Sequence, residues 1–441
     1  MRPARYHAIV DELAARIHSG ELRPGDRLPT IRALMQSHGV ALATASRAMG
    51  ELAAAGLVVG ETGRGTFVRD ASLPRGSGLE HHPAGFGAID LSLSYPTLPG
   101  QDQMLREGLR GIAASGDLDA LLHSAPQGGR PHERQTMARH LRNRGIRLPP
   151  EQVLIVAGAQ HGLAVTLMAL LKPGDVLAVD ALSYPGLLAL ARAQRLDILA
   201  LPQAGGQTDL DALARLCKRR PVRAIYTMPT LHNPLGSVMP ADDRIRLARL
   251  AEQHELMIIE DGTYAFLGEP APAPVITLAP QRTVYVSGLS KSVAAGLRVG
   301  YVAAPLALMP ALERAIRIST SQTASVTTAL ACVWIESGQV DALEDAKRAD
   351  ARRRQALARR ALRGCTVVAH PMSYYLWLPL SGGQRADRIA AALEADGVLL
   401  TTAEPFAATT HVPQAVRVAL GSVAPEALAR ALEIIRAAVT A

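Results

Sequence analysis

The chain has 441 residues, of which 48% are apolar and 20% are charged, and its formal net charge is +8. These values are typical of an ordinary soluble globular protein with two or three domains and a large core. No N-terminal charged-then-apolar signal segment and no uncharged apolar run of membrane-spanning length appear in the sequence, so we expect neither a secreted nor a membrane protein. The three cysteines are scattered without metal-ligand spacing, so we expect a reducing cytoplasm and no metal site.

The first seventy residues predict three helices followed by a β-hairpin. An amphipathic pattern covers residues 6–19, and Thr30 is placed to cap a second helix that ends near Gly39. A third helix is expected over residues 42–55. Two short β runs within residues 57–68 follow, joined by a glycine-rich turn. This order of elements is that of a winged helix-turn-helix, a DNA reader.

The charge of this first module is nearly balanced. Residues 1–70 carry nine arginines against seven acids, a balance of only +2. DNA contacts must therefore come from the placement of single arginines and not from a bulk basic field. Residues 71–88 hold four glycines and two prolines with little periodicity, and a flexible coil of this length spans roughly 20–25 Å. We expect a linker here that lets the reader move or reach a partner subunit.

From residue 89 onward, β and α patterns alternate. Buried strands are expected at residues 153–157, 176–180, 222–228, 256–261 and 283–287, with helices between them. This predicts a mainly parallel, doubly wound α/β sheet. After about residue 305, long Ala/Arg-rich helices and mixed β segments predict a smaller α+β domain. We therefore expect a reader over residues 1–70, a linker over 71–89, a large domain over 90–304 and a small domain over 305–441.

Lysine is scarce, which draws attention to one position. Of 47 basic residues only four are lysines, and Lys291 follows the apolar run of residues 283–287. A lysine amine forms a Schiff base with an aldehyde, whereas a guanidinium does not. Lys172, Lys218 and Lys347 lie beside charged or turn residues and are interpreted as solvated surface.

Several polar groups fall at the ends of the predicted strands. Gly158-Ala-Gln160 opens a helix after the first of these strands, and its free N–H groups suit a phosphate. Asn233, Asp261 and Lys291 follow three further strands. Open α/β sheets bind ligands at this edge, so these groups are expected to form one site. Taken singly, each has a structural interpretation: Asn-Pro as a turn, the acid as a helix cap, Arg298 as a surface charge and Tyr184 as core packing.

The order Gly-x-Gln, Tyr-Pro, Asn-Pro-x-Gly, Asp-x-x-Tyr, Ser-Lys and Arg resembles the fold-type I pyridoxal 5′-phosphate (PLP) enzymes of the aspartate aminotransferase kind, over roughly residues 90–441. The resemblance implies that Lys291 forms the Schiff base and that Asp261 pairs with the pyridine nitrogen. It further implies a ring-binding and phosphate-binding set made of Asn233, Tyr264, Tyr184, Arg298 and the backbone of Ala159 and Gln160. Arg417 matches the family's substrate-carboxylate arginine, with an ordinary strand arginine as the alternative.

Two departures from this pattern are visible. Many relatives have Ser or Thr three residues before the lysine as a phosphate ligand, but this chain has Gly288, which leaves Ser287 or Ser290 as substitutes. The tyrosine that relatives place before a Pro-x-Gly segment is also missing, so His123 or no residue fills its role. Both changes are expected to weaken PLP binding or turnover without removing the chemistry of Lys291.

The first module resembles the GntR winged-helix family over residues 6–69, through the string Leu22-Arg-Pro-Gly-Asp-Arg-Leu-Pro29 and the wing Gly63-Arg-Gly-Thr-Phe-Val68. By this resemblance the residues that face DNA are Arg32, Thr44, Ser46, Arg47, Arg64 and Thr66. The alternative for each is solvated surface. Relatives usually begin the recognition helix with Ser-Arg, whereas this chain has Ala41-Leu42, so a cap and a DNA-contacting charge are missing and affinity is expected to depend on dimer avidity.

Reader, linker and aminotransferase-like domain together resemble the MocR subfamily of bacterial regulators. The resemblance implies a homodimeric, PLP-binding transcription regulator that senses PLP or an amino compound as an external aldimine and responds on a double-stranded operator. Two alternatives stay open: an active aminotransferase with a regulatory N-terminal module, and a DNA-binding protein whose large domain only dimerises. The arginine-rich helix of residues 351–363 is assigned to a solvated face, with DNA as the other interpretation.

Overall fold

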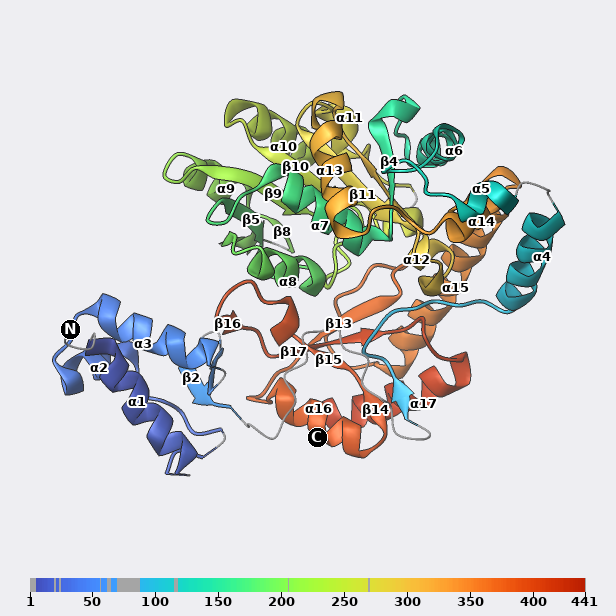
Figure 1. Ribbon diagram of the computed structural model, residues 1–441. Helices are drawn as coiled ribbons and strands as arrows, with labels where there is room; N and C mark the ends of the chain where they lie inside the picture. The colour runs from blue at the N-terminus through green and yellow to red at the C-terminus, as the bar shows by residue number, and fades with distance from the viewer. Residues whose placement is uncertain are drawn as a thin grey trace.

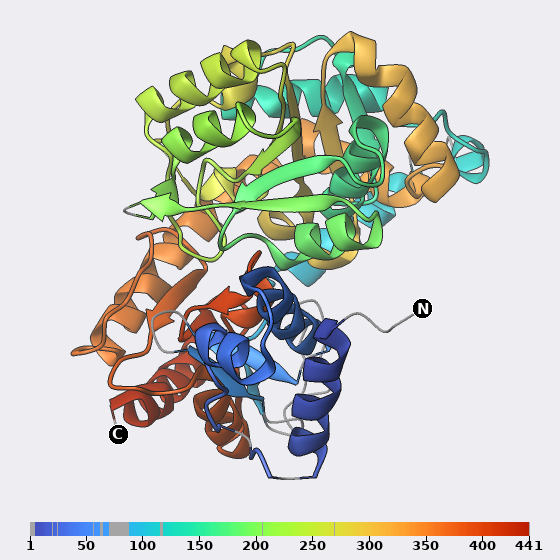
Figure 2. The ribbon, with the colours of Figure 1, turned by 90° about the vertical axis from the view of Figure 1, so that its left-hand side faces the viewer.

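The computed structural model describes residues 5–19, 21–23, 25–55, 57–61, 65–69, 88–114, 118–204, 206–268 and 270–440. Three bodies are visible in Figure 1. A large domain lies above a small domain, and the N-terminal reader lies beside the small domain. Figure 2, turned by 90°, shows the reader in front of the small domain and below the large one.

The reader consists of helices α1 (Arg5–His18), α2 (Ile31–His38) and α3 (Leu42–Ala54), followed by the antiparallel pair β1 (Val58–Glu61) and β2 (Gly65–Val68). The three helices and the hairpin expected from the sequence are confirmed, with ends that agree within two residues. Thr30 caps α2, since its Oγ1 accepts a hydrogen bond from the Ala33 N–H at 3.2 Å. The core of this module is built from the apolar residues Ile9, Leu13, Leu28, Leu34, Ala45, Ala48, Leu52, Val58 and Val68.

The large domain is built on a seven-stranded sheet. In spatial order its strands are β4 (Val153–Val156), β12 (Gly300–Ala303), β11 (Thr283–Gly288), β10 (Met257–Asp261), β9 (Val222–Thr227), β5 (Val176–Asp180) and β6 (Asp197–Leu201). All neighbours are parallel except β12, which is antiparallel to both β11 and β4. The predicted doubly wound, mainly parallel sheet is therefore confirmed. A small hairpin, β7 (Gln203–Ala204) and β8 (Gln207–Thr208), follows β6.

Helices cover both faces of this sheet. In β4, Leu154 and Val156 face one apolar cluster together with α7 (Ala159–Leu170), α8 (Pro185–Ala193) and α13 (Met309–Ser319). Val153 and Ile155 face the opposite cluster, with residues of α6 (Pro131–Leu141) and α14 (Ser325–Glu336). Because β4 is buried on both faces, its sequence is a continuous apolar run, and this run is what predicted the strand. The remaining helices of this domain are α4 (Gln101–Ala114), α5 (Leu118–Leu122), α9 (Leu210–Cys217), α10 (Ala241–Gln253), α11 (Val275–Leu278) and α12 (Leu289–Ser292).

The small domain is an α+β unit. Its antiparallel sheet has the order β13 (Tyr375–Pro379), β17 (Ala415–Ala419) and β15 (Thr401–Thr402), packed by α15 (Gln339–Ala361), α16 (Ala386–Ala395) and α17 (Pro425–Thr440). Strand β14 (Val398–Leu399) pairs in parallel with β3 (Ile89–Asp90). The chain thus enters the small domain first, although the sequence placed residue 90 in the large domain. Helix α15 runs between the two domains (Figure 1).

The reader is joined to the small domain by a shared sheet. Strand β16 (His411–Val412) pairs in parallel with β1, with Gly60 opposite His411 and Glu61 opposite Val412. An ion pair between Arg69 and Glu404 lies beside this junction. The hairpin of the reader is therefore completed into three strands by a segment more than 340 residues away in sequence.

Candidate functional site

A cavity lies where the carboxyl ends of the large-domain strands face the small domain. Its free volume is about 130 Å³, whereas one ordered water needs roughly 10–15 Å³ on this measure, so it has room for a small organic ligand. All the residues that the sequence predicted for cofactor and carboxylate binding are among those that line it: Ala159, Gln160, Tyr184, Asn233, Asp261, Tyr264, Ser290, Lys291, Arg298 and Arg417. The structure brings this whole set together, while the role of each residue stays a prediction.

Lys291 lies on α12, directly after β11. Its Nζ donates a hydrogen bond to the Ser94 carbonyl at 2.5 Å and lies 4.4 Å from the ring centroid of Tyr95. Burial, together with the positive charges of Arg417, Arg298 and Lys347, lowers the pKa of Lys291 to about 7. Because the neutral amine is the nucleophile, this environment prepares Lys291 for reaction with a carbonyl near neutral pH.

Asp261 ends β10 at the floor of the cavity. Its carboxylate accepts hydrogen bonds from the Tyr226 hydroxyl and from the Thr263 N–H, both at 2.9 Å. Burial raises the pKa of Asp261, and these two hydrogen bonds oppose the rise. A buried carboxylate of this kind favours a cationic partner, such as a protonated ring nitrogen.

Two further groups at the cavity offer hydrogen bonds. Asn233 follows β9, and its buried Oδ1 has no hydrogen-bond partner within the described part of the chain. Burial raises the pKa of Tyr264 to about 12, so its hydroxyl keeps its proton and is able to donate. Both suit a phenolic oxygen on a bound ring.

The start of α7 forms an anion cradle with Arg298. Gly158 precedes α7 with φ of 85° and provides no side-chain cap, which leaves the first N–H groups of the helix available. A Cβ at Gly158 would lie 2.8 Å from Nη2 of Arg298, so only glycine lets the guanidinium approach this closely. Arg298 itself adopts a left-handed φ of 51°. The backbone is therefore held in an unusual conformation to bring a cation to a helix N-terminus.

The presence of glycine at position 288, where many relatives have Ser or Thr, has a local explanation. A Cβ there would lie 3.1 Å from the Val299 carbonyl and 3.2 Å from the Ala159 N–H, so a side chain would crowd the cradle. Of the two expected substitutes, Ser287 donates to the Gly262 carbonyl at 3.1 Å. The hydroxyl of Ser290 is buried, lines the cavity and has no partner among the described residues. Ser290 is thus the serine that stays available for a ligand.

Arg417 reaches the cavity from β17 in the small domain. It is buried, donates through Nη2 to the Ser92 carbonyl, and its Cζ lies 5.4 Å from the ring centroid of Phe406. Its Nε is buried without a partner in the part of the chain that the structure describes. A buried guanidinium with an unused donor suits a carboxylate ligand. Tyr184 forms part of the cavity wall from the N-terminus of α8.

Sequence reasoning missed several cavity residues and misjudged one lysine. Ser94 and Tyr95 line the cavity, and the string Leu-Ser-Tyr-Pro that holds them at 93–96 recurs at 182–185 around Tyr184, a signal that was available. Phe406 also lines the cavity, without any sequence signal that we recognise. The interpretation of Lys347 as solvated surface is wrong, because its side chain is fully buried. His123, which was expected as a substitute for the tyrosine of relatives, is exposed, and its Nε2 lies 3.2 Å from Oδ2 of Asp119.

The helix expected over residues 351–363 is the second half of α15 and is not simply a solvated face. Arg354 is buried, and its guanidinium donates to Asp350 at 2.6 Å and to the carbonyls of Leu420 and Val423, both at 2.7 Å. Arg352, Arg353, Arg359 and Arg360 are exposed. Part of this arginine content therefore anchors the small domain.

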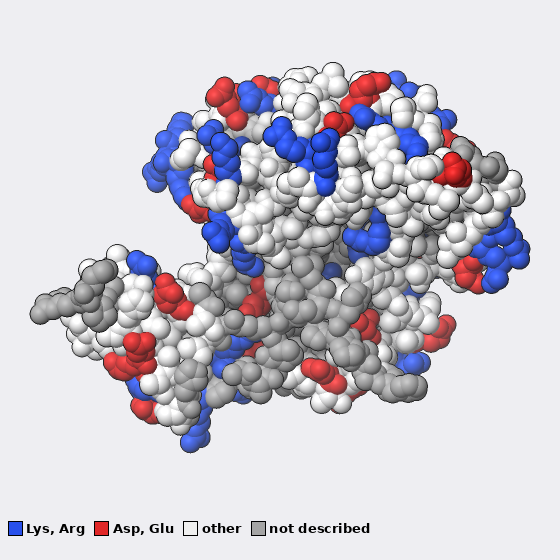
Figure 3. Space-filling model, viewed as in Figure 1, with Lys and Arg blue, Asp and Glu red and all other residues white. Residues whose placement is uncertain are grey.

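The predicted DNA-facing residues lie on the outer parts of the reader. Arg32, Ser46 and Arg47 are exposed and Thr44 and Thr66 are half-buried, while Arg64 lies outside the described residues. Arg47 packs its guanidinium 4.3 Å from the ring centroid of Tyr6. Ala41 gives α3 no side-chain cap, in line with the departure seen in the sequence. Figure 3 shows acidic and basic side chains interspersed on the visible face of the reader.

Comparisons with known proteins agree with both halves of the chain. The model of the family "Aminotransferase class I and II" matches residues 89–435, and that of "Bacterial regulatory proteins, gntR family" matches residues 5–68. The chain belongs to the aminotransferase class I and II family. With its GntR module it is a GntR-type transcription regulator of the MocR kind, fused to an aminotransferase-like domain, and regulators of the GntR family bind DNA.

Relatives share this organisation. The HTH-type transcriptional regulator YdeF of Bacillus subtilis is 29% identical, over 94% of this chain and 90% of its own. MocR of Rhizobium meliloti is 26% identical, over 70% of this chain and 67% of its own. The α-aminoadipate aminotransferase LysN of Thermus thermophilus superposes with a TM-score of 0.74 at 22% identity, covering 80% of this chain and 92% of its own, a likeness of fold.

PLP is the cofactor of the aminotransferase family, and the cavity of this MocR-type chain fits it. The unpartnered oxygen of Asn233 suits the ring hydroxyl, and the buried carboxylate of Asp261 suits the protonated ring nitrogen. The unpartnered hydroxyl of Ser290 and the anion cradle at Arg298 suit the phosphate. In the described part of the chain, no group of His, Cys, Asp and Glu side chains is arranged to hold a metal ion, and no helix is long and apolar enough to cross a bilayer.

Proposed function

We propose that this regulator binds PLP through Lys291 and senses PLP or an amino compound that exchanges onto it, and that it acts as a homodimer on an operator in the cytoplasm. The observation that carries the proposal is that one cavity holds a lysine with a lowered pKa, a buried carboxylate and an anion cradle. The same chain carries a DNA reader that shares a sheet with the domain lining this cavity.

The side chains divide the work of recognition. When bound, PLP supplies an aldehyde and an electron-withdrawing ring. Lys291 offers a neutral amine to the aldehyde, and Asp261 holds the proton on the ring nitrogen. Asn233 and Tyr264 bind the ring hydroxyl, and Tyr184 packs against the ring face. The phosphate is held by Arg298, Ser290 and the N–H groups of Ala159 and Gln160.

Arg417 selects the effector in this proposal. Its free Nε lies in the cavity with Lys291, so an amino compound that also carries a carboxylate is able to contact both residues. Two-pronged pairing of a guanidinium with a carboxylate is directional and strong. We therefore expect amino acids to be preferred over simple amines.

A short segment of the small domain, residues 403–412, supports coupling between the cavity and the reader. On one side Phe406 lines the cavity, and its carbonyl accepts a hydrogen bond from Ser183 N–H at 2.8 Å, next to Tyr184. On the other side the segment becomes β16, which pairs with β1 of the reader. A ligand that displaces Phe406 thus acts on a strand of the reader's own sheet. Residues 71–87 of the linker, which we expected to let the reader move or reach a partner subunit, lie outside the described residues.

The Arg69–Glu404 ion pair provides a test of this coupling. Glu404→Gln should leave PLP affinity unchanged but reduce the effect of the effector on DNA affinity several-fold, because the pair joins the reader to the segment that carries Phe406. Fluorescence anisotropy of labelled operator, with and without effector, measures the change. Glu426→Gln, at an exposed position of α17, is the matched control. An unchanged effector response in the Glu404 variant would contradict this route.

Exposed apolar residues support the homodimer. Helix α14 contacts both α4 and α5, and these helices expose Leu105, Leu109, Leu122 and Val326. Leu122 is 84% exposed, and several exposed apolar side chains on adjoining helices are typical of an interaction surface. A second copy of the chain covering this face would bring two readers to one operator.

The double variant Leu105→Glu/Leu109→Glu is expected to be monomeric, since two charges would be buried at the interface of the two copies. Its DNA affinity should fall at least tenfold, because avidity is lost. Light scattering after gel filtration measures the mass. Ile245→Glu on α10, at a residue of similar exposure (38%), is the control. A double variant with the mass of a dimer would place the interface elsewhere.

The proposed function is tested by titrating purified protein with PLP and amino compounds, while measuring affinity for a duplex selected from a random pool. One class of amino compound is expected to change the DNA dissociation constant about 5- to 150-fold, the range of ordinary allosteric coupling. No change with PLP or any amine would overturn the sensing role. Sustained turnover with an amino donor and a 2-oxo acid would instead favour an active aminotransferase. A protein that binds no PLP would favour a large domain that serves only for dimerisation.

A further inference from the structure

A second lysine is buried next to the cofactor lysine. Lys347 lies on α15, and its side chain is fully enclosed. Its Nζ donates three hydrogen bonds, to the carbonyls of Pro96 at 2.9 Å, Lys291 at 3.0 Å and Val293 at 2.7 Å. All three N–H groups of the ammonium are thus used on main-chain oxygens.

This cation has no carboxylate directly opposite it. Within the described residues Lys347 makes no ion pair, since Glu344 is engaged by Arg144 and Asp350 is engaged by Arg354 at 2.6 Å. Burying an ammonium without a counter-ion is unfavourable, and an apolar residue on this face of α15 would pack without that cost. Burial lowers the pKa of Lys347 to about 7, although Glu344 and Asp350 oppose the shift. The chain therefore keeps a destabilising group at this position.

The positions of the three carbonyls that accept hydrogen bonds from Lys347 indicate the role of this lysine. Those of Lys291 and Val293 belong to the turn that carries the reactive amine. The carbonyl of Pro96 belongs to the segment whose Ser94 carbonyl accepts the hydrogen bond of the Lys291 amine. Lys347 therefore ties together the base of the Lys291 side chain and the wall that its tip contacts.

We propose that Lys347 is a positioning residue for Lys291, fixing the main chain of the Lys291 turn against the segment of residues 94–96 that the Lys291 amine contacts. The inference rests on the proposed function, because it concerns the lysine that would hold PLP. Lys347 itself does not line the cavity, so it acts through Lys291 and not on a ligand.

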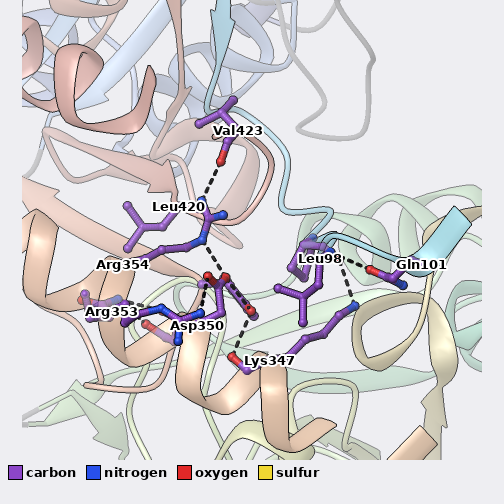
Figure 4. A network of polar contacts seen from close by, with 12 residues as sticks. Leu98, Gln101, Lys347, Asp350, Arg353, Arg354, Leu420 and Val423 are labelled. Carbon is purple, nitrogen blue, oxygen red and sulfur yellow. Dashed lines mark hydrogen bonds and ion pairs between the residues drawn. The ribbon is translucent and has the colours of Figure 1, made fainter. Parts of the chain in front are cut away.

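Helix α15 extends this clamp to the small domain. The Tyr374 hydroxyl contacts the Lys347 carbonyl at 2.9 Å and Asp350 at 3.0 Å, and Arg354 binds Asp350 and the carbonyls of Leu420 and Val423. Figure 4 shows this chain of contacts from Val423 through Arg354 and Asp350 to Lys347. A displacement of the small domain along this path reaches the Lys291 turn.

Lys347 also shares the electrostatic surroundings of Lys291. The charged groups that act on the pKa of the Lys291 amine are Arg417 from β17, Arg298 after α12, and Lys347 from α15. Tyr95 packs its ring against the amine, and Asp261, Tyr184 and Tyr264 line the same cavity. All three cations lower the pKa of Lys291, so removing one of them raises it.

The test compares Lys347→Met with wild type and with Lys218→Met, which removes an exposed lysine. In the apoprotein, the pH dependence of acylation of Lys291 is followed by peptide mass analysis. Its midpoint should rise by about one pH unit in Lys347→Met, which would lower the fraction of neutral amine at pH 7 about fivefold, from about one half to about one tenth. The dissociation constant for PLP, measured by spectral titration, should rise at least tenfold. A midpoint and a constant equal to those of Lys218→Met would overturn the proposal.

A second variant separates position from charge. Gln101 also donates to the Val293 carbonyl, at 2.8 Å, and is labelled beside Lys347 in Figure 4. Gln101→Ala should weaken PLP binding several-fold while leaving the acylation midpoint of Lys291 unchanged. If Lys347→Met does not fold, an unchanged PLP affinity in Gln101→Ala overturns the positioning role. Wild-type protein that fails to attach PLP at Lys291 would refute the proposed function, whereas the outcomes above refute only the clamp.

Discussion

Replacing Lys291 with alanine is expected to abolish covalent attachment of PLP. Among the residues that the structure describes, Lys291 is the only lysine that lines the cavity, and an alanine leaves the aldehyde without a nucleophile. Lys291→Arg should give the same result, because a guanidinium does not react in this way. Borohydride reduction of PLP-saturated protein followed by peptide mass analysis measures the attachment. Label found on Lys172 or Lys218, or an unchanged absorption band in the alanine variant, would contradict the assignment.

The pH dependence of this attachment follows from the state of the amine. The pKa of Lys291 is lowered to about 7, so the reactive neutral form predominates above pH 7 and becomes about tenfold rarer for each pH unit below it. The initial rate of attachment to apoprotein should therefore fall steeply between pH 7 and pH 5. An ordinary exposed lysine would lose its neutral form already far above this range. A rate profile with its midpoint near pH 10 would show that burial does not act on this residue as the structure indicates.

Removing the carboxylate of Asp261 is expected to weaken PLP binding strongly. Truncating one partner of a buried, hydrogen-bonded charge pair costs about 2–5 kcal/mol, or roughly 30-fold to several thousand-fold in the dissociation constant. Asp261→Ala removes such a partner, since the carboxylate is buried and held in place by Tyr226 and Thr263. Equilibrium spectral titration of apoprotein measures the effect.

Two further variants give that result its meaning. Tyr226→Phe removes one hydrogen bond to Asp261 and should weaken PLP binding by only about 1 kcal/mol, because the carboxylate stays in place. Asp211→Asn, at an exposed residue, should have no effect. Asp261→Ala protein that binds PLP as tightly as Asp211→Asn would mean that the ring nitrogen is not bound at the end of β10.

The parts of the fold that the sequence predicts are those set by local periodicity and turns. Strands such as β4 and β5 are buried on both faces and appear as apolar runs, and the α2 cap at Thr30 is a local hydrogen bond. The site follows from the topology, since parallel strands bring the groups at their carboxyl ends to one edge. Arg417 comes from another domain, and only the family resemblance placed it at this site.

The features that escaped prediction depend on contacts between distant segments. Strand β16 has two residues and no periodicity of its own, so nothing before the structure pointed to its pairing with β1. Lys347 was misjudged from its charged neighbours, although Val340, Leu343, Lys347, Ala351 and Ala358 recur at helical spacing along the buried side of α15. A polar residue on such a stripe is a more informative signal than the chemistry of the residues next to it.

The pairing of β16 with β1 has a consequence for how operators are recognised. A reader held only by a flexible tether would accept many separations between two recognition sequences. Here the small domain contributes a strand to the reader's sheet, so the reader's orientation is inherited from the body to which β16 belongs. In a two-fold assembly, the distance between the two half-sites is then set by the aminotransferase-like domains. Inserting five base pairs between the half-sites would turn one of them to the opposite side of the duplex.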